Sequence, residues 1–358
     1  MSFERILNLV YLSSFLLLFL YGQRLQISLA LVNVRRSLNR LEGFRTLARS
    51  RFLDSILKYN KNKADVENRI QRATNSFTIT PVSLDPSGLV RKLEHVLDNY
   101  DIHLKTEVRT LATGATETEV NTLTNQLEVS IGLDQMYRVV RHYYLLARKQ
   151  GGLFALAQLQ MALPTIMGEA EAYSAAVDSF AQGKPVGDGV GPMVASRLAE
   201  GTQPKEFDTD TVVFNVPLEG RELFVVRAKG PGGNVGKPGS AVERLIKESG
   251  PIKLVLTVDA ALKLEGELSG SVAEGTGAAI GGPGTERYHI EESATKNGVP
   301  LAAVIVQMSS KEAISTMTPQ IERGSEEAAS RVKNLILLQT NVGDKVIVVG
   351  VGNTIGIA

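Results

Sequence analysis

The residues best suited to chemistry lie in a glycine-rich loop that follows an apolar, β-branched run. This loop, residues 229–239, has the sequence KGPGGNVGKPG. Its two lysines would neutralise a phosphate, and the backbone N–H groups of its glycines would approach an anion closely. The ligand-binding candidates in this loop are Lys229, Gly230, Gly232, Gly233, Gly236 and Lys237.

The same loop matches no complete phosphate-binding motif. A P-loop requires GxxxxGK[ST], but Pro231 stands at its first glycine and Pro238 stands where a hydroxyl would bind the metal. A GxGxxG motif requires its third glycine where Val235 stands. Taken alone, the loop suits a flexible corner equally well, so its place in the fold must decide.

A second loop, residues 259–284, combines glycines with carboxylates. Asp259 ends an expected strand, and Glu265 and Glu267 follow on either side of Gly266, where the chain can turn. Carboxylate oxygens are the ligands that Mg²⁺ prefers, and the ion would bridge them to a phosphate. We therefore expect a Mg²⁺ site at Asp259, Glu265 and Glu267, with solvated surface carboxylates as the alternative.

Two glycine turns share the pattern Gly-x-Gly-x-x-Ile-Gly, at residues 275–281 and 350–356. If both turns line one pocket, they add further candidates for ligand contact. These are Gly275, Gly277, Gly281 and Asn353. In a chain with 33 glycines, chance explains the repeat about as well.

The stretch PVGDGVGP, residues 185–192, has two functional interpretations. It looks like the turn of a helix-hairpin-helix in DNA-binding proteins, and like the GDGIGP corner of decarboxylating dehydrogenases. Met193 and the helical segment before the stretch depart from these patterns. The alternative is a tight turn between helices, in which the glycines adopt positive φ. Asp188 stays a residue that could reach a ligand.

The elements that must position these loops are short apolar strands alternating with helices. We expect strands at 211–217, 222–228, 252–258, 301–307 and 345–350, and helices at 240–249, 285–297 and 310–340. The last three strands are apolar almost throughout, which is typical of a parallel sheet covered on both faces. The sequence therefore predicts a Rossmann-like open α/β domain at 205–358. Its ligand would lie beyond the carboxyl ends of the strands, where the glycine loops gather.

The N-terminal segment predicts a membrane anchor. Residues 6–21 carry no charge, and residues 3–23 are long enough to cross a bilayer if the flanking arginines reach its interfaces. A cleaved signal peptide and a buried core helix are the alternatives. Most arginines follow the span, so we expect a single-pass protein of the cell membrane whose bulk is cytoplasmic.

Beyond residues 1–24, the anchor, we expect a basic juxtamembrane helix at 25–75 and a helical domain at 76–204. Residues 1–75 hold 13 Lys or Arg against 5 Asp or Glu, although the whole chain has a net charge of only +1. Leu31, Val34, Leu38 and Leu41 follow heptad spacing up to Gly43, which predicts either a homo-oligomer or a helix on the protein's own surface or on anionic lipid. No nucleic acid is expected, because aromatic residues do not alternate with the basic ones.

Some classes of chemistry are excluded or disfavoured. The chain has no cysteine, which removes disulfides, thiolate metal sites and cysteine nucleophiles. The motifs GxSxG and HExxH and the EF-hand loop do not occur. His95 and His142 lack a second metal-type ligand at i+4, so we expect interfacial or hydrogen-bonded histidines. His289 lies among Glu286, Glu291 and Glu292, where we expect a solvated helix face.

Several motifs together resemble a known family. They are PVSLDP (81–86), PVGDGVGP (185–192), AKGPGG with VGKPG (228–239), VDAALKLEGE (258–267) and AIGGPG (279–284). Behind an N-terminal anchor, they resemble the archaeal membrane-anchored family called domain of unknown function 1512, over nearly the whole chain. The resemblance implies an archaeal source and no particular activity. From the residues we expect binding of a nucleotide or other phosphorylated ligand, with Mg²⁺, and the alternative is a scaffold or regulatory subunit that oligomerises through its helical region.

Overall fold

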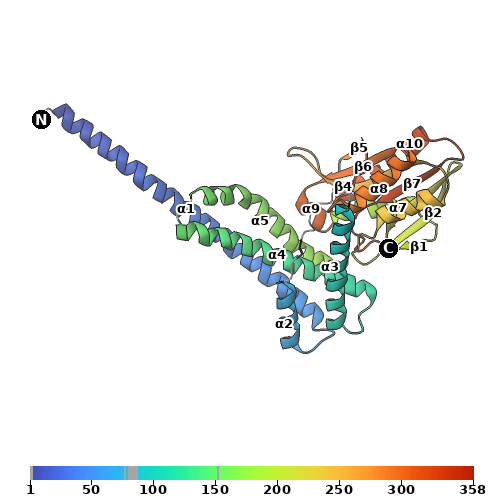
Figure 1. Cartoon of the computed structure of the whole chain (residues 1–358), viewed down its shortest axis with the longest axis horizontal. Helices are drawn as coiled ribbons and strands as arrows, with labels where there is room; N and C mark the ends of the chain where they lie inside the picture. Colours follow the sequence, from blue (N-terminus) through green and yellow to red (C-terminus); the bar gives the residue numbers. More distant parts are fainter. Residues whose placement is uncertain (1–2, 76–77, 80–87, 151–152) are drawn as a thin grey trace.

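The computed structural model describes residues 3–75, 78–79, 88–150 and 153–358. The chain forms a helical N-terminal half and a C-terminal α/β half that lie side by side (Figure 1). The PVSLDP motif at 81–86 lies outside the described residues. The helical half comprises α1 (Phe3–Ile56), α2 (Lys63–Ala73), α3 (Leu89–Leu111), α4 (Glu117–Gln150) and α5 (Leu153–Gln182).

The heptad seam of α1 is buried inside its own chain. Val34 and Leu41 have no exposed surface, and they pack with apolar residues of α4 and α5. Gly43 does not interrupt the helix, which continues to Ile56. Of the alternatives for this seam, the structure shows the helix packed on the protein's own surface.

The arginines of α1 also contact the protein itself. Three ion pairs join α1 to α4 and α5, namely Arg40–Glu171 (2.6 Å), Arg45–Asp134 (3.5 Å) and Arg51–Asp178 (3.5 Å). Part of the basic excess of the first 75 residues thus meets acids from later in the chain. The segment 25–75 is two helices rather than one, because the chain leaves α1 after Ile56 and begins α2 at Lys63.

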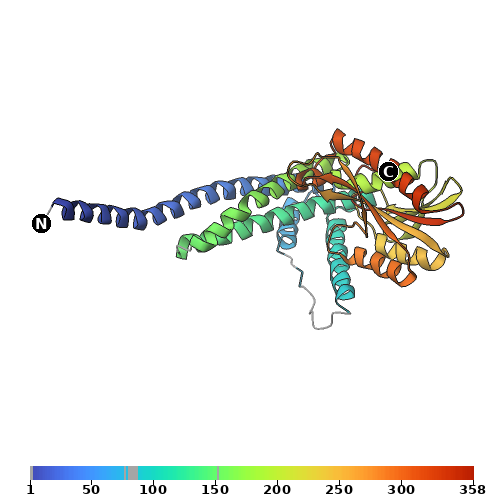
Figure 2. The ribbon, with the colours of Figure 1, turned by 90° about the horizontal axis from the view of Figure 1, so that it is seen from above.

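The N-terminal half of α1 projects away from the other helices (Figures 1 and 2). Within the part of this segment whose side chains are described, Tyr11, Leu12 and Phe15 are 69%, 69% and 71% exposed. None of the helices, searched over the described residues, is long and apolar enough to qualify as a membrane span. The side chains at 3–6, 8–9, 17–20 and 23–24, which belong to the predicted anchor, lie outside that description.

The α/β half contains a seven-stranded sheet of order β1-β2-β3-β7-β4-β6-β5. Its strands are β1 (Lys205–Asp208), β2 (Thr211–Leu218), β3 (Arg221–Ala228), β4 (Ile252–Leu262), β5 (Val272–Thr276), β6 (Leu301–Met308) and β7 (Lys345–Gly350). The four central strands run parallel, and β1, β2 and β5 pair antiparallel at the two edges. The mixed α/β fold with a mostly parallel sheet is confirmed.

All five predicted strands are present, and β1 and β5 are additional. Both additional strands are short and lie at the sheet edges, where partial exposure leaves no apolar run for sequence analysis to detect. The hairpin between β2 and β3 turns at Glu219 and Gly220, whose φ angles of 46° and 78° suit a tight two-residue turn. The expected helix at 310–340 divides into α9 (Ser310–Ile314) and α10 (Pro319–Gln339), because Pro319 occupies the first turn of a new helix capped by Thr318.

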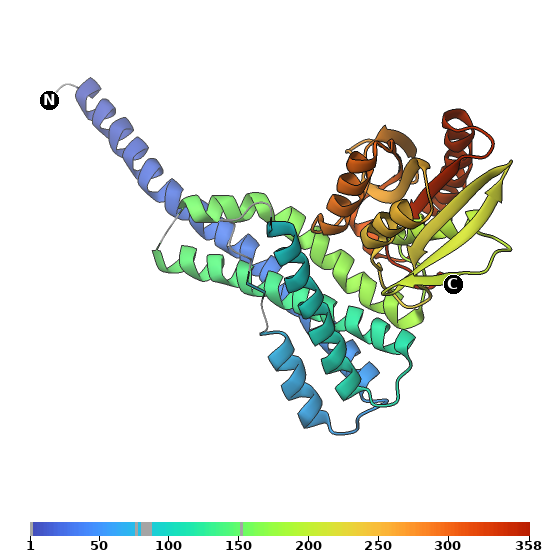
Figure 3. The same ribbon diagram turned by 45° about the vertical axis from the view of Figure 1, so that its right-hand side comes forward.

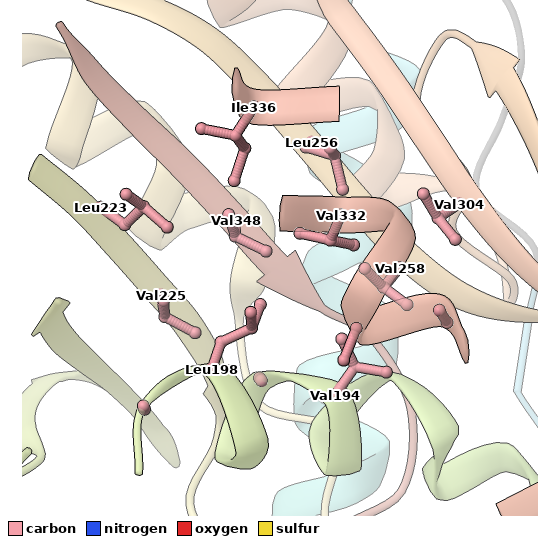
Figure 4. Packing of buried hydrophobic residues seen from close by; sticks show 14 of the residues in the cluster. Val194, Leu198, Leu223, Val225, Leu256, Val258, Val304, Val332, Ile336 and Val348 are labelled. Carbon is pink, nitrogen blue, oxygen red and sulfur yellow. The ribbon is translucent and has the colours of Figure 1, made fainter. Parts of the chain in front are cut away.

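Two apolar layers hold the sheet. On one face, α6 (Val190–Leu198) and α10 cover the strands, and on the other face α7 (Pro238–Glu248) and α8 (Thr285–Asn297) cover them (Figure 2). Figure 4 shows Val194 and Leu198 of α6 beside Val225, Val258 and Val348 of the strands. Each fully buried side chain of this kind stabilises the fold by about 1.5–3 kcal/mol. Although 76–204 was predicted as helical domain, α6 packs within the α/β half.

The two halves contact each other through α3, α4 and α5. The C-terminal end of α5 reaches the α/β half and packs against α9 (Figure 3). Helix α3 lies beside α8 (Figure 2). Only the C-terminal part of α3 is anchored in an apolar cluster, through Leu104, Val108 and Leu111. The N-terminal part of α3 lies outside this cluster, and it can line a site between the halves.

Candidate functional site

A crevice of about 430 Å³ lies at the carboxyl ends of the parallel strands. The loops that follow β3, β5 and β7 all contribute to its wall, at 235–238, 280–285 and 351–352. Helix α3 and the short 3-10 helix η1 (Gly187–Gly189) complete the lining. Parts of the three predicted glycine-rich segments 229–239, 259–284 and 351–357 thus meet at the edge of the sheet where open α/β proteins bind ligands, although the part of 259–284 that lines the crevice beyond Asp259 follows the unpredicted strand β5.

Two carboxylates, Asp188 and Asp259, line this crevice. Asp259 is only 4% exposed, and its two oxygens accept hydrogen bonds from the N–H groups of Ala260 (2.7 Å) and Gly281 (2.8 Å). Asp188 accepts a hydrogen bond from the N–H of Asn353 at 2.9 Å. Neither carboxylate makes an ion pair with a described residue. The fold therefore holds two acids close together through backbone donors alone.

Burial changes the acidity of both groups. It raises the pKa of Asp259 to about 8, with a further contribution from the charge of Asp188, whereas the two backbone N–H donors act in the opposite direction. Burial also raises the pKa of Asp188, partly offset by the N–H of Asn353. At neutral pH the pair consequently retains a proton, which a cation entering between the carboxylates would displace.

The PVGDGVGP stretch carries Asp188 to this position. Its three glycines do not adopt positive φ, so the predicted reason for them is wrong. They are needed for close approach instead. A Cβ at Gly191 would lie 2.1 Å from the carbonyl oxygen of Val351 and 2.4 Å from that of Val258. Only glycine lets the start of α6 press against the ends of β4 and β7.

The rim of the crevice pairs Lys237 with carboxylates. Lys237 forms an ion pair with Asp98 of α3 and lies 3.8 Å from Glu286 of α8. Burial by itself lowers the pKa of Lys237. The hydrogen bond to Asp98 and the charges of Glu286, Asp98 and Glu94 outweigh this effect, so the pKa is raised overall. Glu286 also accepts the N–H of Gly239 at 2.7 Å, so a carboxylate of the chain occupies the anion position at the N-terminus of α7.

The N-terminus of α8 differs from that of α7. It begins after Gly284, which has a positive φ of 90° and no side-chain cap, and both Gly284 and Thr285 line the crevice. The first N–H groups of a helix have no partner within the helix, and they attract anions. This helix N-terminus therefore presents free backbone donors to the crevice.

Helix α3 supplies an acidic wall that sequence analysis missed. Glu94, Asp98 and Asp101 line the crevice, and Glu94 also contacts His289 at 3.1 Å. With Asp188, Asp259 and Glu286, the described residues that line the crevice include six carboxyl groups against one lysine, Lys237. The spacing of the three α3 acids, which places them on one helix face, is the signal that could have revealed them.

His289, His95 and His142 contact neighbouring side chains. His289 bridges α3 and α7, because its second ring nitrogen lies 3.4 Å from Glu243, and it is not on the solvated face that we expected. His95 contacts Asn99 on its own helix, and His142 stacks edge-on against Tyr143.

Only some of the predicted ligand-binding residues reach the crevice. Gly236, Lys237, Asp259 and Gly281 line it, and Gly233 and Asn353 line a neighbouring chamber. Lys229 pairs with Glu206, and Gly230 packs tightly against Ile357. Gly232 lies near Thr118 of α4, while Gly275 and Gly277 lie at the end of edge strand β5.

Two of the three predicted metal ligands, Glu265 and Glu267, do not line the crevice. Strand β4 continues past Asp259 to Leu262, which carries the following acids away from the crevice. Glu265 is exposed, and Glu267 accepts hydrogen bonds from Leu264 (2.7 Å) and Gln307 (3.1 Å). Among the residues that the structure describes, no group of three or more His, Cys, Asp or Glu is arranged to hold a metal.

Fold and crevice define a two-part protein, with a helical half joined to an α/β half that has an acidic crevice at its sheet edge. Residues 8–183 match the model described as "Protein of unknown function (DUF1512) N-terminal domain", and residues 186–358 match "Domain of unknown function (DUF1512) C-terminal". The chain therefore belongs to the DUF1512 family. None of the curated proteins compared with it matches. The two models divide the chain just before η1 and α6.

Proposed function

We propose that the crevice binds a divalent cation between Asp188 and Asp259, together with the phosphate of a nucleotide or another phosphorylated small molecule. The observation that carries this proposal is the pair of carboxylates without a cationic partner at the carboxyl ends of the parallel strands. Mg²⁺ commonly uses one or two protein carboxylates and completes its octahedron with waters and substrate phosphate. The proposed pair is thus Asp259 with Asp188.

The charge of the crevice makes binding of an anionic ligand depend on a cation. An anionic ligand alone would meet six carboxyl groups and one lysine that is already paired. The same ligand with its cation would place positive charge between Asp188 and Asp259, and its phosphate would lie at the free N-terminus of α8. Binding of the phosphorylated ligand should therefore depend strictly on the divalent cation.

The test measures the melting temperature of the purified chain with Mg²⁺ alone, with ATP or ribose 5-phosphate in EDTA, and with each compound plus Mg²⁺. We expect the largest increase with both components present. Asp259→Asn and Asp188→Asn should abolish that increase, because each removes one charge from the cation site.

Glu265→Gln is the matched control, since Glu265 is an exposed carboxylate outside the crevice. It should respond to Mg²⁺ and ligand as the unmodified chain does. Equal stabilisation by the phosphorylated compounds in EDTA, or loss of the response in Glu265→Gln, would contradict the proposal.

We also propose that the projecting N-terminal half of α1 attaches the protein to a lipid bilayer, with the rest of the chain on the cytoplasmic side. The exposed apolar side chains Tyr11, Leu12 and Phe15 support this proposal, as does the excess of arginines that follows them. The alternative is a scaffold or regulatory subunit that oligomerises through its helical region; the heptad seam of α1 would contribute little to such an interface, because α4 and α5 cover it.

Flotation of the purified chain with phosphatidylglycerol-containing vesicles tests the attachment. The unmodified chain should float, whereas Leu12→Asp with Phe15→Asp should stay at the bottom of the gradient. Leu338→Asp is the control, because Leu338 is 82% exposed on the remote helix α10. Flotation of the doubly substituted chain would refute attachment through α1.

A further inference from the structure

A second chamber of about 480 Å³ adjoins the crevice, on the other side of Lys237. It lies between α3, α4 and the loops at 209–210 and 233–237, and it shares Asp98 and Asp101 with the crevice. Its α4 wall is polar and consists of Asn121, Thr124, Asn125 and Glu128. A volume of this size suits a small molecule rather than a single ion.

Four hydrogen-bond donors around this chamber are already in use. Asn125 donates to the carbonyl oxygen of Gly233 at 2.7 Å, and the side-chain amide of Asn234 donates to the carbonyl oxygen of Lys229 at 2.7 Å. Lys105 donates to Asp210 at 2.8 Å. Lys237 is engaged by Asp98.

Several acceptors of the chamber have no such partner. Asp101 and Glu128 make no ion pair or side-chain hydrogen bond with a described residue. Asn121 is 5% exposed, and its Oδ1 has no hydrogen-bond partner; the same holds for the buried Oδ1 of Asn234. Glu128 is half-buried and Asp101 is exposed, whereas the two amide oxygens are buried. Unpaired buried acceptors are costly, so a native protein normally satisfies them.

Two of these acceptors are carboxylates that influence each other. Burial raises the pKa of Glu128 to about 7, with a contribution from the charge of Asp101 that Lys105 partly offsets. Burial also raises the pKa of Asp101, while Lys237 and Lys105 lower it. A positively charged group that donates several N–H bonds would satisfy both carboxylates and the amide oxygens together.

We propose that the second chamber binds an organic cation, namely the ammonium or guanidinium group of a small molecule, through Glu128, Asp101 and Asn121. The chamber differs from the crevice in the ligand it takes, and this site does not depend on the metal site. An alkyl chain of the ligand would pass Ile102, which lies on the wall formed by α3.

The experiment is isothermal titration calorimetry of the purified full chain with spermidine and with agmatine, both in EDTA. We expect saturable binding of at least one of them. Glu128→Gln and Asp101→Asn should each weaken it by ten-fold or more. Because these substitutions remove an unpaired carboxylate and keep its shape, the variants should retain the wild-type melting temperature or exceed it.

Two further variants make the result specific to the chamber. Glu117→Gln, on the same helix but paired with Arg109 at the surface, should bind within two-fold of the unmodified chain. Asp259→Asn should also leave the affinity unchanged. Failure of both cations to bind, full binding by Glu128→Gln, or loss of binding in Asp259→Asn would each overturn the proposal.

Discussion

The two walls of the crevice are built by different means. On the sheet side, Asp188 and Asp259 accept hydrogen bonds from backbone N–H groups, and the strand ends below them lie on two continuous apolar layers. On the α3 side, Asp98 is held by an ion pair with Lys237 and Glu94 by a contact with His289, and the buried apolar residues of α3 begin only at Leu104, after these acids. One wall is fixed by packing, and the other by partly solvated charges.

This difference gives the two walls of the crevice different roles in ligand binding. Backbone donors set within a close-packed core keep the two carboxylates in place without a ligand, so the cost of ordering them is met during folding. Partly exposed ion pairs are worth little individually, and they exchange partners readily. The sheet side is therefore suited to hold a cation, and the α3 side to adapt to what the cation carries.

The largest effect should come from Gly191→Ala. A methyl group there would meet two backbone oxygens that cannot move without displacing β4 and β7, so the free energy of unfolding should fall by about 3 kcal/mol. Urea denaturation followed by circular dichroism measures it. Gly168→Ala, inside α5 with no atom near its added Cβ, should instead stabilise by about 0.5–1 kcal/mol. Equal effects at the two glycines would remove the packing argument for the sheet side.

The pH dependence of stability should show the next effect. Asp259 keeps its proton in the native state up to about pH 8, whereas the unfolded chain releases it near pH 4, so raising the pH favours unfolding. Between pH 5 and pH 8, in EDTA, the unmodified chain should lose about 3 kcal/mol more than Asp259→Asn. Denaturant midpoints at both pH values give the difference. Parallel pH profiles would mean that Asp259 ionises normally in the fold.

On the α3 side, Lys237→Ala should cost only about 1 kcal/mol, because its ion pairs are partly solvated. The effect that distinguishes this variant is confined to α3. Hydrogen exchange in the N-terminal half of α3 should accelerate, while exchange in β4 and β7 should stay slow. Lys345→Ala is the matched control, since Lys345 bonds to Ser249 and Glu222 away from α3. Faster exchange of α3 in that control as well would show a general loss of stability.

The smallest effect should follow Gly281→Ala. Its added Cβ would lie 3.8 Å from Asp259 Oδ2, which is ordinary van der Waals contact, and the N–H that binds Asp259 is retained. We expect a change below about 0.5 kcal/mol in the free energy of unfolding. A loss comparable to that of Gly191→Ala would mean that the crevice wall, and not only the contact between α6 and the ends of β4 and β7, is rigidly packed.

Local sequence patterns predicted much of the α/β half. The apolar runs 301–307 and 345–350 correspond to β6 and β7 almost residue for residue, because a strand buried on both faces leaves a continuous signal. The acidic loop after β4 was predicted less well. Asp259 has the same apolar neighbours whether the strand ends there or continues to Leu262, and only pairing with β6 extends it.

By itself, the sequence determined the strands, the helices and the glycine loops at the strand ends, since these depend on neighbouring residues and on the pleat and helix periods. Tertiary structure alone decided which acids meet. Asp188 and Asp259 are 71 residues apart, and Asp98 and Lys237 come from different halves of the chain. Their proximity follows from the close approach of α6 to the strand ends and from the docking of α3, which are properties of packing that no local pattern records.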